Sequence, residues 1–185
     1  RDAEKQKTIE QKAIEIIVKE GFDGLSMQKL AKAAGVSPAT IYIYFKDRDD
    51  LIIQIGSEEE MKVFEATLKD FDPEMSFEEG MRVQWKNRAR YFLENPLQLH
   101  FMEQLKHSPY YKLVNQESRA SFSNIMSRFI HKAIDNNELR LLPIEVFWSV
   151  AFAPLYQLVK YHINGKGVKN EPYVLDEASI DLTLS

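Results

Sequence analysis

Apolar residues along this chain recur at intervals of three and four, which is the spacing of one face of an α-helix. The first such stripe is made by Ile9, Ala13, Ile16 and Ile17. Strand formers alternate over one short stretch only, residues 41–45, and no other segment has a strand pattern. We therefore predict an all-α chain.

Glycine, serine and proline mark where the first helices should begin and end. Gly21 and Gly35 are placed to end two helices in the left-handed conformation. Ser26 is placed to cap a second helix and Ser37 a third, with Pro38 at a first helical position, where a missing N–H costs nothing. The alternating stretch follows directly, so we predict that it is helical in spite of its alternation.

The same signals predict a larger set of helices in the rest of the chain. Helices are expected after Asp47, after Ser76, from Pro109 with Ser108 as cap, from Pro143 without a break to Ile163, and after Asp176. The predicted architecture is a small three-helix unit, residues 1–47, followed by a larger helical bundle, residues 48–185.

For the question of a nucleic-acid partner, the distribution of charge along the chain is more informative than the net charge. The net charge is 24 − 28 = −4, which argues mildly against a nucleic-acid partner for the chain as a whole. Residues 24–46 nevertheless contain no acid and include Lys29, Lys32 and Lys46. The N-terminal part can therefore carry a locally basic face.

Residues 30–45 have the form of a helix-turn-helix, with two short helices joined by a tight turn. The second helix begins with the small residues Ser-Pro-Ala-Thr, which would let its N-terminus approach base edges in a major groove. Tyr42 and Tyr44 would place hydroxyls near phosphates, and Lys46 and Arg48 would add cations. The alternative is a plain helical hairpin with half-buried tyrosines, and the ring of Tyr44 in particular can lean on the core.

Residues 8–51 resemble the tetracycline-repressor (TetR) family of bacterial transcriptional regulators. The segment AGVSPATIYIYF matches the family pattern of Ala-Gly-Val-Ser followed by Thr-hydrophobe-Tyr-x-Tyr-Phe, and Ser26 stands where a Thr or Ser opens the second helix. Arg48 stands in place of a Lys that usually contacts phosphate, and Ile43 in place of a residue that is polar in many members. The segment NNELR also resembles a turn that many members have before a long helix.

The resemblance implies a homodimer with nine or so helices in each subunit. The first three helices would bind double-stranded operator DNA, and the others would bind a ligand and form the dimer. The expected function is a repressor that a small apolar or aromatic effector releases from its operator. The residues expected to face DNA are Ser26, Ser37, Pro38, Ala39, Thr40, Tyr42, Tyr44, Lys46 and Arg48.

Bulky side chains in the second part are candidates for a ligand cavity. The candidate residues are Trp85, Arg88, Phe92, His100, Phe122, Met126, Trp148 and Phe152. Arg88 and His100 would orient a polar group of the ligand. The alternatives are that the apolar members are ordinary core and that Arg88 forms a surface salt bridge.

The predicted helix from Pro143 is apolar nearly all round, so it should be covered on more than one side. A partner subunit could cover one side, which predicts a homodimer, although a central helix in a monomer would fit equally. We find no acid/base pair, metal-ligand spacing or phosphate loop, and expect neither an enzyme nor a cofactor. With no signal-peptide pattern, membrane span or cysteine, we expect a cytoplasmic protein. The alternative function is a helical small-molecule-binding protein without a working DNA reader.

Overall fold

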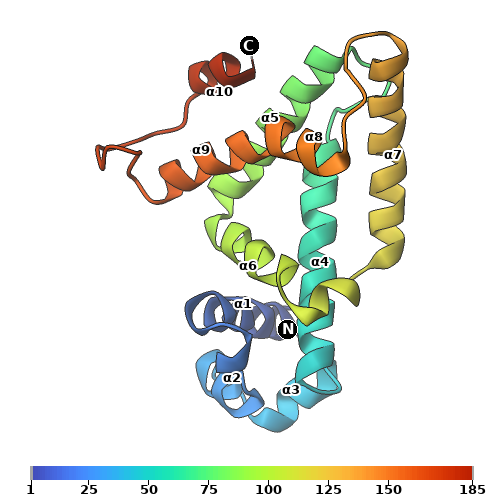
Figure 1. Cartoon of the computed structure of the whole chain (residues 1–185). Coiled ribbons are helices and arrows are strands. Elements are labelled where there is room, and N and C mark those ends of the chain that lie inside the picture. The colour runs from blue at the N-terminus through green and yellow to red at the C-terminus, as the bar shows by residue number, and fades with distance from the viewer. Residues whose placement is uncertain (1, 185) are drawn as a thin grey trace. The chain divides into compact units, whose positions relative to one another are not determined.

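The computed structural model describes residues 2–184, and helices dominate them (Figure 1). Within this range the only β-pairing is one isolated antiparallel bridge between Lys166 and Pro172, so the all-α prediction is confirmed. The elements are α1 (Asp2–Glu20), the 3₁₀ turn η1 (Phe22–Gly24), α2 (Met27–Ala34), α3 (Pro38–Tyr44), α4 (Arg48–Leu68), α5 (Phe77–Glu94), α6 (Pro96–Lys106), the 3₁₀ turn η2 (Pro109–Lys112), α7 (Gln116–Asp135), α8 (Ile144–Ala151), α9 (Ala153–Ile163) and α10 (Glu177–Leu184).

The chain divides into two compact units. The first contains the chain as far as Met61 together with Leu97–Gln116, and the second contains Lys62–Pro96 and the chain from Glu117 onward. The boundary between Met61 and Lys62 falls inside α4. The division by function that the sequence suggested, between residues 47 and 48, is a separate matter and stays a prediction.

The first unit is built around the apolar stripe of α1, which packs against α2 and α3. Ile9, Ala13 and Ile17 have no exposed surface, and Ile41 of α3 is equally buried. The same core takes in the start of α4 and parts of α6 and the segment after it, through Leu51, Ile52, Ile55, Phe101, Leu105 and Val114. The three N-terminal helices therefore share one core with residues that follow them in sequence.

Gly56 marks a close approach inside this unit. A Cβ added to Gly56 would lie 2.9 Å from Cγ2 of Val114 and 3.1 Å from Cδ2 of Leu105. The absence of a side chain thus lets α4 lie directly against the segment from α6 to Val114.

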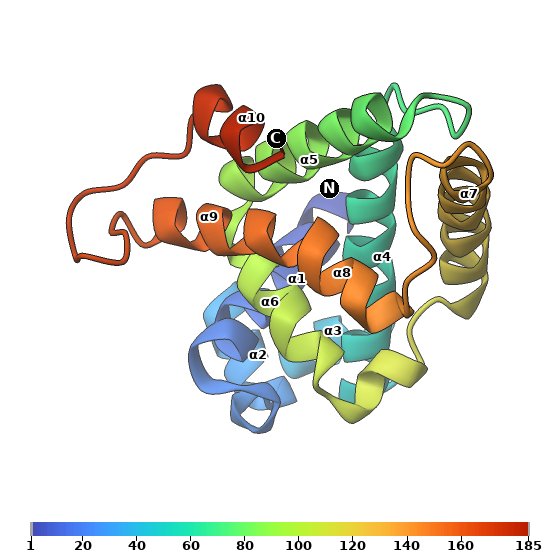
Figure 2. The ribbon, with the colours of Figure 1, turned by 45° about the horizontal axis from the view of Figure 1, so that its top comes forward.

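The second unit is organised around α5, which has α9 and α10 beside it (Figure 2). Trp85 and Phe92 of α5 are buried, as are Leu155 and Val159 of α9. Beyond the end of α7, a carboxylate oxygen of Glu138 accepts a hydrogen bond of 2.5 Å from the backbone N–H of Phe77 at the start of α5.

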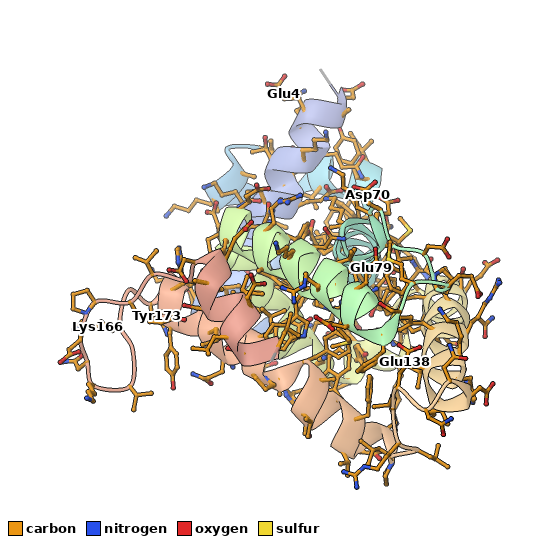
Figure 3. All side chains as sticks on the ribbon, turned by 90° about the horizontal axis from the view of Figure 1, so that it is seen from above. Glu4, Asp70, Glu79, Glu138, Lys166 and Tyr173 are labelled. Atoms are coloured by element: carbon orange, nitrogen blue, oxygen red, sulfur yellow. The ribbon has the colours of Figure 1, made fainter. Side chains whose placement is uncertain are left out.

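The segment between α9 and α10 holds Lys166 and Tyr173 (Figure 3). The ring of Tyr173 meets that of Tyr161 edge to face at 5.8 Å, and the backbone N–H of Leu175 donates to Nδ1 of His162 at 3.0 Å. These contacts anchor the segment to α9.

The prediction of one unbroken helix from Pro143 to Ile163 is wrong. It is interrupted at Phe152, where φ is −127°, and α8 and α9 lie on either side of the interruption. Pro154 is the cause, because proline has no N–H to donate to the carbonyl of Val150 and its ring would clash with that carbonyl. The indole N–H of Trp85 donates to the neighbouring carbonyl of Ala151 at 2.7 Å.

Two smaller expectations also need correction. Gly21 follows α1 with φ +76° and ψ 174°, which is an extended glycine conformation and not the left-handed helical one. Ser108 does not cap a long helix, because its hydroxyl donates back to the carbonyl of Leu105 at 2.8 Å. The segment after it is only the 3₁₀ turn η2, and the long helix α7 begins at Gln116.

Candidate nucleic-acid interface

The turn between α2 and α3 is fixed by three local features. Gly35 ends α2 in the left-handed conformation, with φ +67° and ψ 32°, and its N–H bonds carbonyls of the last turn. The hydroxyl of Ser37 accepts from the N–H of Thr40 at 3.2 Å and lies 2.9 Å from the hydroxyl of Thr40. Ser26 caps α2 in the same way, by accepting from the N–H of Lys29 at 3.2 Å. Two capped helices and a left-handed glycine together give a helix-turn-helix.

One face of α3 is anchored, and the other is open. Ile41 and Phe45 are at most 1% exposed, whereas Tyr42 is 53% and Ile43 76% exposed. The first turn is also open, because Ser37, Pro38 and Ala39 are exposed and Thr40 is half-buried. An exposed helix start with small side chains is the shape that a major groove accepts.

The two tyrosines of α3 have different surroundings. Tyr42 projects from the surface, but Tyr44 is half-buried and packs against the core of the first unit. The hydroxyl of Tyr44 lies 3.4 Å from the backbone carbonyl of Asp2, to which it donates. Tyr42 is therefore accessible to another molecule, whereas Tyr44 contributes part of its surface and its hydroxyl to contacts within the first unit.

The lysines near α3 also differ in their contacts within the protein. Lys46 is exposed, and its backbone N–H donates to a carboxylate oxygen of Asp50 at 2.8 Å. Hydrogen bonds from the side chain of Gln54 and from this N–H hold the pKa of Asp50 below its usual value. Lys32 is exposed as well, whereas Lys29 forms an ion pair with Glu20.

Arg48 points into the first unit. Its Nε donates to the carbonyl of Leu25 at 2.8 Å, one terminal nitrogen donates to the carbonyl of Phe22, and the other donates to the hydroxyl of Tyr110 at 2.9 Å. The last nitrogen also lies 3.3 Å from a carboxylate oxygen of Asp49. All three nitrogens are therefore engaged within the protein, so a phosphate contact from Arg48 would require the loss of some of these bonds.

The partners of Arg48 were not identified from the sequence. Tyr110 lies 62 residues away, and its hydroxyl donates to Asp49 at 2.7 Å. Burial, followed by the hydrogen bond to Asp49, raises the pKa of Tyr110 above its usual value. Near Tyr110, the sequence contains only Pro109, which opens η2, and this proline does not indicate that Tyr110 lies beside Arg48.

The helix-turn-helix is also what connects this chain to known proteins. Residues 9–55 match the family model described as bacterial regulatory proteins, tetR family. The N-terminal region of the chain, residues 9–55, therefore belongs to the TetR family of regulatory proteins.

Relatives and solved structures of TetR-type regulators agree with this membership. An HTH-type transcriptional regulator of Haemophilus influenzae is 42% identical over 98 residues, which cover 52% of each chain. A fatty acid metabolism regulator protein of Bacillus subtilis is 32% identical over 71 residues, or 38% of this chain and 37% of that protein. A TetR family transcription regulator from Marinobacter aquaeolei aligns over 100% of this chain and 93% of its own, with a TM-score of 0.81 and 26% identity. The match thus spans about half the length, or less, of the curated relatives.

The residues predicted to line a ligand cavity fall into separate groups. Arg88 lies over the ring of Phe152, with 4.3 Å from Cζ to the ring centroid. The ring of Trp148 is 4.9 Å from that of Phe152, and Tyr156 links Trp148, at 6.3 Å, to Phe92, at 5.8 Å. Trp85 joins the same region through its bond to Ala151. This group of the second unit is called the aromatic cluster below: Trp85, Arg88, Phe92, Trp148, Phe152 and Tyr156.

The other candidates have different neighbours. Phe122 of α7 stacks on Phe64 at 4.3 Å with an interplanar angle of 11°, and Met126 is half-buried on the same helix. His100 belongs to α6 in the first unit, where its Nδ1 lies 3.9 Å from a carboxylate oxygen of Glu103. Tyr156 is the member of the aromatic cluster that was not among the predicted ligand residues.

Residues 2–184 contain neither a membrane-spanning helix nor a cluster of metal-binding side chains. No helix there combines the length and the apolar character that a membrane crossing requires. Over the same residues, no group of three or more His, Cys, Asp or Glu side chains could hold a metal ion.

Proposed function

We propose that this chain is a transcriptional regulator that binds operator DNA through α3. One observation carries the proposal. The first turn of α3 is capped, exposed and free of bulky side chains, while Ile41 and Phe45 hold the helix from behind. Ser37, Pro38, Ala39 and Thr40 would enter the major groove, and Tyr42 and Lys46 would contact the phosphates beside it.

The exposed Ser26 and the half-buried Tyr44 and Arg48 complete the proposed interface. Ser26 presents the capped start of α2, where backbone N–H groups favour phosphate. Tyr44 and Arg48 are bonded within the first unit, so we expect them mainly to hold α3 and the start of α4 in place.

We also propose that the regulator acts as a homodimer. Several large apolar side chains of the second unit are exposed on α8, on the segment before it and on α10. The most exposed are Leu141 at 80%, Leu182 at 77%, Val150 at 68% and Ile144 at 67%. Large apolar side chains that are exposed on a surface are typical of a protein interface where they form one patch. Two reading heads about 34 Å apart would then meet successive major grooves.

A small molecule is the proposed signal, and release from the operator, which ends repression, is the proposed response. The aromatic cluster provides bulky surroundings for an apolar body, and Phe122 and Met126 of the same unit remain candidates for contact with it. One relative is named as a fatty acid metabolism regulator, which fits an apolar signal. The cytoplasm is the compartment that a DNA-binding regulator requires.

Selection from a random duplex library at low salt, followed by fluorescence anisotropy with the selected sequence, tests the proposal. We expect a partly palindromic site, occupied by two chains, whose binding weakens as salt is raised. If no sequence is enriched, the DNA-binding function is rejected, and the alternative of a small-molecule-binding protein without a working reader is favoured.

A further inference from the structure

Arg88 is a buried cation with no acid beside it. It is 3% exposed and lies on α5 in the aromatic cluster. One of its nitrogens donates to the backbone carbonyl of Gln84 at 3.4 Å and to the side-chain oxygen of Gln84. The hydroxyl of Tyr156 and the ring face of Phe152 are its other neighbours. Within residues 2–184, none of these partners carries a negative charge at neutral pH.

Such a group is unfavourable in a protein interior. Burial lowers the pKa of Arg88, and the neighbouring Tyr156 opposes that shift, but an arginine stays protonated at neutral pH in either case. A buried charge is normally compensated by an opposite charge and by a complete set of hydrogen bonds. Arg88 has a ring face, two oxygens of one residue and a phenol instead.

Gln84 also has a buried hydrogen-bond donor without an acceptor. Its side chain has no exposed surface. Because a guanidinium has donors only, the amide must turn its oxygen toward Arg88, and its nitrogen then points away. That nitrogen, Nε2, is buried and has no hydrogen-bond partner in the described part of the chain. Arg88 and Gln84 thus form a pair in which both residues have N–H groups to offer and no anion to receive them.

The surroundings of this pair are apolar and reach the surface. The ring of Phe152 is close to both Arg88 and the indole of Trp148. Trp148 in turn forms the wall of an open hollow of about 450 Å³ that is also lined by Ile144, Glu145 and Ser149. Glu145, the one acid of this lining, is exposed, so water screens its charge.

We infer that the effector of this regulator is an organic monoanion, with a carboxylate bound by Arg88 and Gln84 and an apolar body placed among Trp148, Phe152 and Phe92. This inference rests on the proposed function. One cation and one unpaired amide nitrogen match the two oxygens of a single carboxylate. A neutral molecule of the same shape would leave the buried charge uncompensated.

Isothermal titration calorimetry with matched pairs of compounds tests this inference. The pairs are octanoate with octanamide and 2-naphthoate with 2-naphthamide, which differ in charge and little in shape. We expect the carboxylate of at least one pair to bind at least tenfold more tightly than its amide. Arg88→Met should remove that preference, and Arg90→Met, an exposed arginine on the same helix, should keep it. Gln84→Leu should reduce the preference while leaving the guanidinium in place.

Three results would overturn the inference. The first is equal affinity for carboxylate and amide, the second is an unchanged preference in Arg88→Met and Gln84→Leu, and the third is no binding by any of the four compounds. Operator affinity is measured in the same samples. If a neutral compound releases DNA without any preference for charge, the inference fails and the proposed function stands. If no operator is bound at all, the proposed function fails independently of how the carboxylates behave.

Discussion

Arg48 in the first unit and Arg88 in the second are both drawn inward, but their surroundings differ. Arg48 is held by two backbone carbonyls, a phenol and a carboxylate. Arg88 is more deeply buried and has one amide residue, a phenol and a ring. We therefore expect the first arginine to stabilise the fold, and we infer that the effector supplies the counter-charge that the second lacks.

The largest expected effect is on Arg48. Arg48→Met should lower the free energy of unfolding by about 2 kcal/mol, because hydrogen bonds to a charged group are lost and the carbonyls of Phe22 and Leu25 lose their donor. Urea denaturation measures the change. A variant as stable as the parent protein would show that Arg48 is not a structural arginine, and its phosphate-contact role would regain support.

A substitution of the exposed Tyr42 should affect DNA binding without affecting the stability of the first unit. Tyr42→Ala should weaken operator binding about tenfold, or about 1.4 kcal/mol, and leave thermal stability unchanged because the ring is exposed. The slope of log K against log salt should stay the same, since no cation is removed. Lys46→Gln should instead make that slope shallower by about 0.9. If Tyr42→Ala binds with the parent affinity, the phosphate contact is excluded.

Arg88 should respond in the opposite direction from Arg48. Without ligand, Arg88→Met should raise the free energy of unfolding by about 1 kcal/mol, because an apolar side chain of similar length replaces an uncompensated buried charge. Arg90→Met is the control and should change stability by less than about 0.5 kcal/mol. A clear loss of stability in Arg88→Met would show that its bonds to Gln84 and Tyr156 are worth more than the burial costs.

The smallest expected change in stability is that of Tyr110→Phe, and its size depends on pH. Its folded pKa is raised, so the stability that its hydroxyl contributes is complete below its unfolded pKa near 10 and is lost as pH rises through the folded value. Tyr110→Phe should lower stability at pH 7 by about 1 kcal/mol or less. It should also flatten the fall in stability above about pH 10. An identical alkaline profile in the variant and the parent would remove Tyr110 from the bonding of Arg48.

The features that the sequence predicted well are local ones. The caps at Ser26 and Ser37 and the turn at Gly35 depend on residues at most four apart, and the structure confirms them. The helical spacing of Trp85 and Arg88 also placed both side chains on one buried face. Contacts of this range follow from residue type and spacing.

Features that depend on distant backbone could not be predicted in the same way. The carbonyls that Arg48 meets have no side-chain signature, because every residue has a carbonyl. Nor could the lack of an acid beside Arg88 be read from its neighbours in sequence. The interruption at Phe152 is different, since Pro154 was visible and its effect on the carbonyl four residues earlier was underestimated.

The interruption between α8 and α9 also gives the protein an internal optical probe. Trp85 and Trp148 are its only tryptophans, and both report on this point of the chain. Trp85 is buried with its N–H bonded to the carbonyl of Ala151, so its emission should be blue-shifted and insensitive to aqueous quenchers. Trp148 is half-buried at the edge of the hollow, so iodide or acrylamide should reach it. Any movement of α8 relative to α9 would therefore change the intrinsic fluorescence, and the motion could be followed in the unlabelled protein.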